Sequence, residues 1–109
     1  MRVIGHGELF EQLCVEYAGV DDVTVPDGSS RGFGAKAIKI NGAVFVMLIQ
    51  GQLAVKVPAA RVRELVDRGQ GEPLSAGKTT PMREWVRLTG GEDDVRPVIA
   101  EAEHFVAAQ

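Results

Sequence analysis

The chain has 109 residues, a net charge of −3, an apolar fraction of 45% and a single cysteine. This length predicts one domain with a continuous core, and one cysteine excludes an internal disulfide. No apolar run reaches the roughly 20 residues that span a bilayer, and the N-terminus lacks the apolar core of a signal peptide. We therefore expect one domain over residues 1–109, in a cytoplasmic location and with no membrane partner.

Charge is distributed unevenly along the chain. Residues 1–27 carry a net charge of −5, residues 28–91 a net charge of +6, and residues 92–109 a net charge of −4. One interpretation is that acidic terminal helices pack against the basic middle segment and neutralise it. The other interpretation is that the middle segment presents a basic surface to an anionic partner.

Apolar residues at helical spacing predict an N-terminal helix over residues 7–18. The stripe consists of Leu9, Phe10, Leu13, Cys14 and Tyr17. Because Cys14 belongs to this stripe, we interpret it as a buried core thiol rather than a nucleophile. A short strand is expected at residues 23–25, where Pro26 stops it.

Three apolar runs of strand length follow, separated by two short polar turns. The first turn is Asn41-Gly42 and the second is Gln50-Gly51. Asn-Gly between β-prone runs favours a two-residue hairpin turn with positive φ at both positions. We therefore predict an antiparallel β-meander over residues 33–57, on which the rest of the chain packs.

Two-residue turns also predict which meander residues share a face, because directly opposed side chains point the same way. Ile38 is then opposite Phe45, and Val46 is opposite Val55. The face expected to pack against helices consists of Ala37, Lys39, Val44, Val46, Leu48, Leu53, Val55 and Val57. The second face consists of Ile38, Ile40, Phe45, Met47, Ile49, Ala54 and Lys56.

The second predicted face is too apolar to be left to water. We expect its cover to come from the chain beyond residue 80 or from another subunit, with cover from the same chain as the simpler arrangement. The candidate partner-binding residues on this face are Ile38, Ile40, Phe45 and Met47.

The second half of the chain predicts two more helices and one more strand. Pro58 suits the first position of a middle helix over residues 58–68, and a polar, glycine-rich loop follows at residues 69–80. An alternating segment at residues 82–88 predicts a strand added at a sheet edge, and an apolar stripe predicts a C-terminal helix over residues 93–107. The predicted class is therefore α+β, with a meander and an added strand packed against three helices.

No combination of residues predicts catalysis or a bound cofactor. The Gly-Lys-Thr sequence at residues 77–79 resembles the end of a phosphate-binding P-loop, but Glu72 stands where the earlier glycine is required and a strand, not a helix, is expected next. His6, Cys14 and His104 lack the spacing of a metal site and the third member of a catalytic set. We therefore predict a non-enzymatic protein without a metal or cofactor.

Basic residues around the only tryptophan form the one pattern with binding character. Trp85 between Arg83 and Arg87 suits stacking on a base or a hot spot at a protein interface; the alternative is a core or edge-strand tryptophan. The candidate contacts for an anion or a nucleic acid are Lys36, Lys39, Lys78, Arg83, Trp85 and Arg87. A small-ligand site near Trp85 and residues 69–80 is a further hypothesis.

Several short motifs follow one another over residues 9–107, and their order is informative. In chain order they are Gly32-Phe33-Gly34, Asn41-Gly42, Phe45, Leu53 to Val57, Arg61 to Leu65, Gly71 to Pro73, Gly77-Lys78, Pro81-Met82 and Glu84 to Val86. Their order resembles the N-terminal domain of the TfoX (Sxy) family, which is related to the YjbR-like domains. The chain departs from the family pattern at Gly32, where methionine is usual, and at residues 35–37, where glycines are common.

The resemblance implies a small α+β fold and a bacterial regulatory function. The better-known members regulate natural competence with a transcription factor and carry a second, C-terminal domain, whereas this chain matches only the first domain. The resemblance supplies no catalytic residues, and the DNA-binding role of YjbR-like domains is itself a proposal. We expect a non-enzymatic regulatory or protein-interaction module with a protein partner or a homodimer. The alternatives are weak nucleic-acid binding through the basic middle segment and small-ligand binding near residues 69–80.

Overall fold

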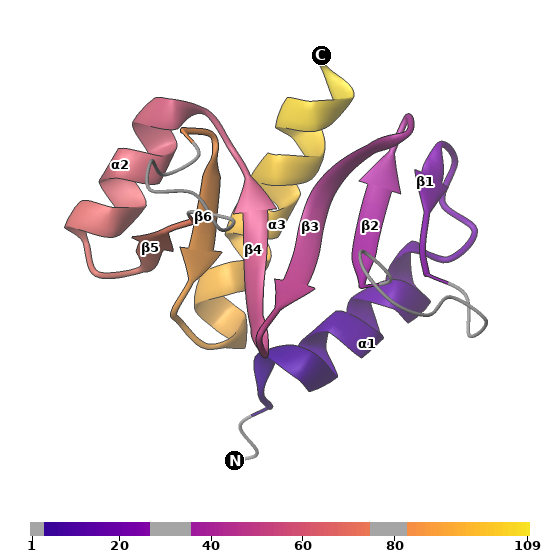
Figure 1. The fold of residues 1–109 in the computed structure, drawn as a ribbon. Coiled ribbons are helices and arrows are strands. Elements are labelled where there is room, and N and C mark those ends of the chain that lie inside the picture. Colours follow the sequence, from indigo (N-terminus) through magenta and orange to yellow (C-terminus); the bar gives the residue numbers. More distant parts are fainter. Residues whose placement is uncertain (1–3, 27–35, 75–82) are drawn as a thin grey trace.

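The computed structural model describes residues 4–26, 36–74 and 83–109 (Figure 1). Its elements, in chain order, are α1 (His6–Tyr17), β1 (Val23–Thr24), β2 (Ala37–Ile40), β3 (Ala43–Ile49), β4 (Gln52–Lys56), α2 (Ala59–Asp67), β5 (Gly71–Pro73), β6 (Trp85–Leu88) and α3 (Glu92–Ala107). The α+β class, the meander and the three expected helices are confirmed. Residues 33–35 of the predicted meander and residues 75–80 of the predicted loop lie outside the described residues.

The strands form one antiparallel sheet in the order β1-β2-β3-β4-β6-β5. The meander strands β2, β3 and β4 are adjacent, and β1 extends the sheet beyond β2, with Val23 opposite Ile40. β6 pairs with β4, with Val86 opposite Val55, and with β5 on its other side, so the prediction that this strand lies at a sheet edge is wrong. β5 was not predicted because Gly71–Pro73 contains no β-prone residue; it pairs with β6 at the sheet edge.

Both hairpin turns have the predicted backbone geometry. The φ angles are 53° at Asn41 and 83° at Gly42, and 51° at Gln50 and 81° at Gly51. Positive φ at both central residues defines the type I′ turn, whose twist matches that of the flanking strands. The two-residue turns predicted for the meander are therefore confirmed.

The first hairpin departs from the predicted register in the middle of its ladder. Lys39 pairs with Val44 but Ile38 pairs with Val46, so Phe45 is an extra residue on β3. An extra residue of this kind is a β-bulge, and it changes which residues of the two strands share a face. The predicted pairing of Ile38 with Phe45 is therefore wrong, whereas the second hairpin pairs as expected.

The bulge determines which meander residues enter the core. Ile38, Ile40 and Phe45 are buried in the core cluster, whereas Met47 lies on the opposite face of the sheet and is half-buried. The prediction that these four residues form one partner-binding face is therefore wrong. It assumed an unbroken ladder, which placed Lys39 toward the helices; the bulge leaves Lys39 exposed instead.

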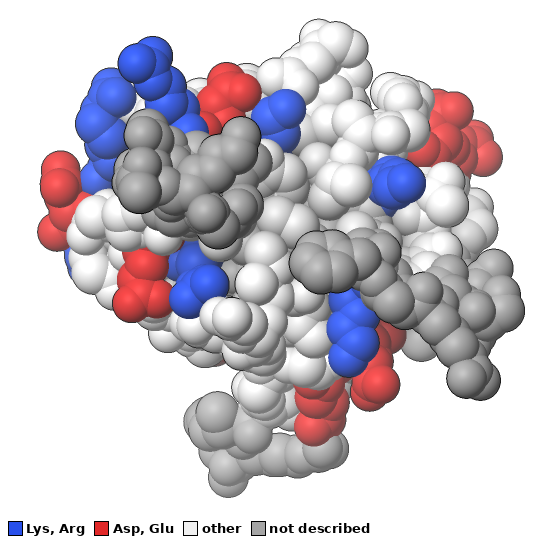
Figure 2. Space-filling model, in the orientation of Figure 1, with Lys and Arg blue, Asp and Glu red and all other residues white. Residues whose placement is uncertain are grey.

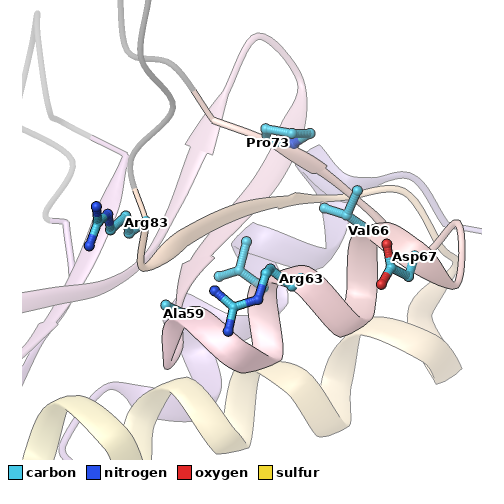
Figure 3. Close-up of a pocket in the computed structure, with 7 residues that line it drawn as sticks. Ala59, Arg63, Val66, Asp67, Pro73 and Arg83 are labelled. Atoms are coloured by element: carbon cyan, nitrogen blue, oxygen red, sulfur yellow. The ribbon is translucent and has the colours of Figure 1, made fainter.

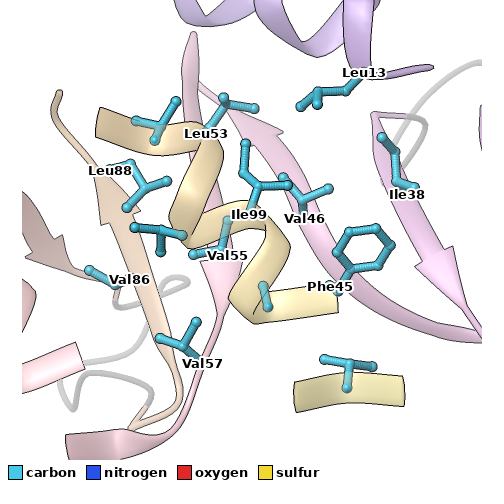
Figure 4. Close-up of a cluster of buried hydrophobic side chains, with 14 of the residues drawn as sticks. Leu13, Ile38, Phe45, Val46, Leu53, Val55, Val57, Val86, Leu88 and Ile99 are labelled. Carbon is cyan, nitrogen blue, oxygen red and sulfur yellow. The ribbon is translucent and has the colours of Figure 1, made fainter. Parts of the chain in front are cut away.

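All three helices pack on one face of the sheet, and α3 passes behind β4 in Figure 1. α1 and α3 contact β3 and β4, whereas α2 contacts β5 and β6. Val62 and Leu65 of α2 belong to the same buried cluster as Leu13 of α1 and Ile99 of α3. Figure 4 shows the strand side chains of this cluster directed toward α3. This single helix layer covers the face on which the bulge places the apolar residues.

Ion pairs join neighbouring helices within the layer. Arg96 of α3 contacts Glu16 of α1 at 2.8 Å, and Arg61 of α2 contacts Glu101 of α3 at 2.9 Å. Partly exposed ion pairs contribute about 0–1 kcal/mol each. They therefore set the order of the helices, with α3 between α1 and α2, more than the stability of the fold.

Tyr17 connects α1 to both the sheet and α3. Its hydroxyl donates to Glu103 Oε1 at 2.7 Å, and its ring makes an edge-to-face contact with Phe45 at 5.5 Å between centroids. Burial and the hydrogen bond to the carboxylate raise the pKa of Tyr17 well above its ordinary value of 10.0, since both disfavour the phenolate. The folded state therefore favours the neutral, protonated side chain of Tyr17.

His6 links the start of α1 to two other parts of the fold. Its Nδ1 accepts from the Leu53 backbone N–H at 2.9 Å, and its Nε2 lies 2.8 Å from the Gly90 carbonyl oxygen. Accepting at Nδ1 requires the proton on Nε2, which then donates to Gly90. Both ring nitrogens of His6 therefore hold the start of α1 against β4 and the segment before α3.

We predict that replacing Gly71 by alanine destabilises the fold. A Cβ at Gly71 would lie 2.5 Å from Val86 Cγ2 and 3.4 Å from Leu65 Cβ, so β5 would have to move away from α2 and β6. The expected loss is about 1–3 kcal/mol of unfolding free energy, measured by urea denaturation. The control is Gly7→Ala, because a Cβ at Gly7 in α1 meets nothing within 4 Å. Alanine should stabilise α1 there by up to about 1 kcal/mol, and equal urea midpoints for the two variants would contradict the packing at Gly71.

We predict that Tyr17→Phe removes part of the alkaline instability of the protein. The folded state raises the pKa of Tyr17 above its ordinary 10.0, so the unfolded chain loses its proton first. The contribution of Tyr17 to stability is present below about pH 10 and decreases as pH rises above it. Thermal unfolding between about pH 9 and 11 should show a steeper loss of stability for the wild type than for Tyr17→Phe. If the stability of the two proteins fell equally with pH, the ionisation of Tyr17 would not be coupled to folding.

Candidate functional site

The face of the sheet opposite the helices has a mixed apolar and basic composition. No helix of the described part of the chain packs on it. By strand register it consists of Ala37, Lys39, Val44, Met47, Ile49, Gln52, Ala54, Lys56, Glu72, Trp85 and Arg87. We call this set the helix-free face. Its charged side chains are three cations and one carboxylate, so the face is basic although the whole chain is acidic.

Trp85 lies on the helix-free face with a cation on each of two sides. Lys56 is its direct cross-strand partner, and Arg87 lies two residues along β6 on the same face. Trp85, Lys56 and Arg87 are each half-buried, so each side chain contacts the protein while part of it stays accessible. This places an aromatic ring between an ammonium and a guanidinium group on a sheet surface.

Arg87 has hydrogen-bonding capacity that its neighbours do not use. It lies between Ala54 of β4 and Glu72 of β5 in the register, and its Nη2 donates to Gln50 Oε1 at 3.4 Å. Its Nε is buried and has no acceptor within the described residues. A guanidinium carries five N–H donors, and a buried donor without an acceptor is unfavourable. The buried Nε is out of reach of a ligand, so an anionic acceptor would bind the accessible part of the Arg87 guanidinium.

The terminal helices are acidic, whereas the lysines of the meander lie on the other face of the sheet. α1 and α3 contain eight acidic residues and one arginine, Arg96, and Arg96 is paired with Glu16 and Glu92 within that layer. By contrast, Lys39 and Lys56 form no ion pair with any residue that the structure describes. Figure 2, in the orientation of Figure 1, shows basic and acidic side chains around a largely uncharged central area. Pairing of the terminal helices with the meander lysines is thus not seen in the described ranges.

The structure divides the residues predicted to contact an anion or a nucleic acid. Lys39, Trp85 and Arg87 are all on the helix-free face, but β3 and β4 separate Lys39 from the other two; exposed Lys36 precedes β2. Arg83 is exposed and lines a separate cavity. Lys78 lies outside the described residues. Trp85 is a residue of β6, which is not an edge strand, and it lies beside basic side chains and outside the helix-packed core.

Sequence reasoning missed Lys56 as a member of the basic group. The signal was present, since Lys56 alternates with the buried residues Leu53, Val55 and Val57 and must therefore point away from the helices. What the sequence does not contain is the pairing of β4 with β6. That pairing, across 29 residues of chain, places Lys56 opposite Trp85.

A cavity of about 600 Å³ lies between α2 and the β5–β6 side of the sheet (Figure 3). It is lined by Ala59, Val62, Arg63, Val66, Asp67, Pro73 and Arg83. This cavity is separate from the helix-free face, because its walls come from the exposed side of α2. Of its charged residues, only Arg83 was predicted as an anion contact.

The described residues contain no arrangement of side chains typical of catalysis. They include no cluster of three or more His, Cys, Asp or Glu side chains able to hold a metal ion. Burial and the nearby carboxylate of Glu11 raise the pKa of the Cys14 thiol, which lowers the fraction of the nucleophilic thiolate. None of the helices in the described ranges has the length and apolar character of a membrane span.

Comparison of the chain with family models, with curated proteins and with solved structures found no match. The resemblance to the TfoX N-terminal domain and to YjbR-like domains therefore stays a prediction from the sequence. The candidate function below rests on the geometry and charge of the helix-free face.

Proposed function

We propose that this chain is a non-enzymatic binding module whose helix-free face binds a single-stranded nucleic acid. The observation that carries the proposal is the position of Trp85, between Lys56 across the ladder and Arg87 along the strand. A tryptophan ring stacks on any base, and stacking contributes about 1–3 kcal/mol per base. Adjacent cations bind the phosphates that connect stacked bases.

The shape of the surface supports a single strand over a duplex. Recognition of duplex DNA typically places a helix or a β-ribbon in the major groove. Here the cations and the tryptophan lie on a broad sheet face, and the solvent side of the helix layer is acidic. A flat face with one aromatic ring and spaced cations suits unpaired bases and a flexible backbone.

The charge distribution also favours one side of the protein for binding of the strand. The acidic helices α1 and α3 lie on the far side of the sheet, so a polyanion is repelled from the helix layer and attracted to the helix-free face. Glu72 is the one carboxylate on that face, and its register partner is Arg87. With few cations in the face, we expect weak binding that depends strongly on salt.

The test is a titration with a single-stranded oligonucleotide, followed through the fluorescence of Trp85. Because Trp85 is the only tryptophan, quenching on binding reports directly on this face. Three phosphate contacts predict that affinity falls about tenfold or more when salt rises from about 50 to about 200 mM. The affinity of each variant is measured by the fluorescence anisotropy of a labelled oligonucleotide. Trp85→Leu should lower this affinity about tenfold. Lys56→Gln should lower affinity less and reduce the slope of its salt dependence.

The matched control is Arg68→Gln, which removes one positive charge from α2 outside the helix-free face. Arg68 is exposed, and its ion pair within the described residues is with Glu64, at 3.5 Å, so this variant should bind the oligonucleotide as the wild type does. Equal losses for Lys56→Gln and Arg68→Gln would mean that net charge, not the helix-free face, governs binding. No binding at low salt would reject the proposal.

A second candidate function is a protein interaction through the C-terminal end of α1, as the family resemblance implies. The observation favouring it is the exposure of two valines, 77% for Val15 and 41% for Val20. A second copy of the chain that covers them would form a homodimer. Light scattering should then show a dimer that Val15→Glu dissociates, because burying a carboxylate is costly. Ala60→Glu, at an exposed position of α2, should leave the dimer intact; a monomeric wild type would contradict this candidate.

A further inference from the structure

The cavity beside α2 combines an apolar wall with charges of both signs. Its volume of about 600 Å³ is within the range of small-molecule pockets, about 300–1,000 Å³. The apolar part is formed by Ala59, Val62, Val66 and Pro73. The charged part is formed by two arginines and one aspartate. Ligand sites typically combine an apolar lining with a few polar groups in this way.

The charged residues of the cavity are unlike the other charged residues of α2. Arg61 is paired with Glu101 and Glu64, and Arg68 is paired with Glu64. Arg63 of the same helix forms no ion pair with any described residue, although Asp67 lies one turn later. The carboxylate of Asp67 is likewise unpaired within the described ranges, as is the guanidinium of Arg83. Three charged groups that line one cavity are thus free to bind a ligand.

The positions of these groups specify the charges of the ligand. Figure 3 shows Arg63, Val66 and Asp67 along α2, with Pro73 and Arg83 across from the helix. Two guanidinium groups favour a carboxylate, which each can bind through two parallel hydrogen bonds. Asp67 favours an ammonium group and disfavours a second anion. The apolar wall between them favours an apolar side chain.

The spacing of the charged residues favours a ligand larger than a single amino acid. Arg63 and Asp67 are four residues apart on α2, so their Cβ atoms are about 5–6 Å apart, and their charged atoms, which form no ion pair, are more than 4.0 Å apart. The chain length per residue is about 3.3–3.6 Å, so an extended dipeptide holds its ammonium and carboxylate about 7 Å apart. A single amino acid carries both charged groups on one α-carbon, so they are closer together than in a dipeptide.

We propose that this cavity binds dipeptides with apolar side chains. The ligand carboxylate binds Arg63 and Arg83, the ligand ammonium binds Asp67, and the ligand side chains contact Val62, Val66 and Pro73. This site goes beyond the proposed function, because it uses none of the residues of the helix-free face. Either site can therefore be tested while the other is left unchanged.

The test is calorimetric titration with leucyl-leucine, its N-acetyl derivative, its C-terminal amide and inorganic phosphate. The free dipeptide should bind best, and the amide should bind at least about tenfold more weakly because it lacks the carboxylate. Arg63→Gln and Arg83→Gln should each weaken the free dipeptide about tenfold, whereas Arg68→Gln and Lys56→Gln should change it less than about twofold. Asp67→Asn should remove the preference of the protein for the free dipeptide over its N-acetyl derivative.

Several results would overturn the proposal. One is the absence of leucyl-leucine binding at millimolar concentration by a wild-type protein whose thermal unfolding is cooperative. Another is binding of phosphate, but not of the dipeptide, with the same dependence on the two arginines. A third is an equal effect of Arg63→Gln and Arg68→Gln. Because Trp85→Leu and Lys56→Gln leave the cavity intact, loss of oligonucleotide binding and loss of dipeptide binding are separate outcomes.

Discussion

Phe45 occupies a position on β3 that has no partner on β2, between the residues that pair with Ile38 and Lys39. Both Phe45 and Val46 are consequently buried, and the ring of Phe45 meets Tyr17 of α1. The same extra residue places Ile38 on the helix-packed face and Lys39 on the other. Without the bulge, the sheet would bury a lysine and expose isoleucines, at a cost of several kcal/mol. The division of the sheet into an apolar face and a basic face depends on it.

That division leaves the acidic terminal helices and the meander lysines on opposite faces of the sheet. The terminal segments are acidic and fold into α1 and α3, which pack side by side against the apolar face. Their carboxylates are used within the helix layer, for example by Arg96 and by the Tyr17 hydroxyl. The lysines and Arg87 of the sheet are left on the far side. A chain with a net charge of −3 thereby has one basic surface.

The candidate site was only partly predictable from the residues. The basic residues around Trp85 were identified because they are neighbours in sequence, and neighbours at i and i+2 of a strand share a face. Lys56 was not identified, because its contact with Trp85 depends on long-range pairing of β4 with β6. Arg63 and Asp67 carry no such signal, because charged residues on a helix ordinarily face solvent. Their role in a cavity depends on where β5 and Arg83 lie, and Gly71–Pro73 carries no strand signal of its own.

The sequence by itself determined the elements whose causes are local. Positive φ at Asn41-Gly42 and Gln50-Gly51, the apolar stripes of the three helices, and the α+β class all follow from patterns within short segments. Only the tertiary structure decided the register of the first hairpin and the order of the strands. A bulge changes local pairing by one residue, and its free energy comes from burial of Phe45 and Val46 beneath helices from both ends of the chain. No local pattern contains that packing.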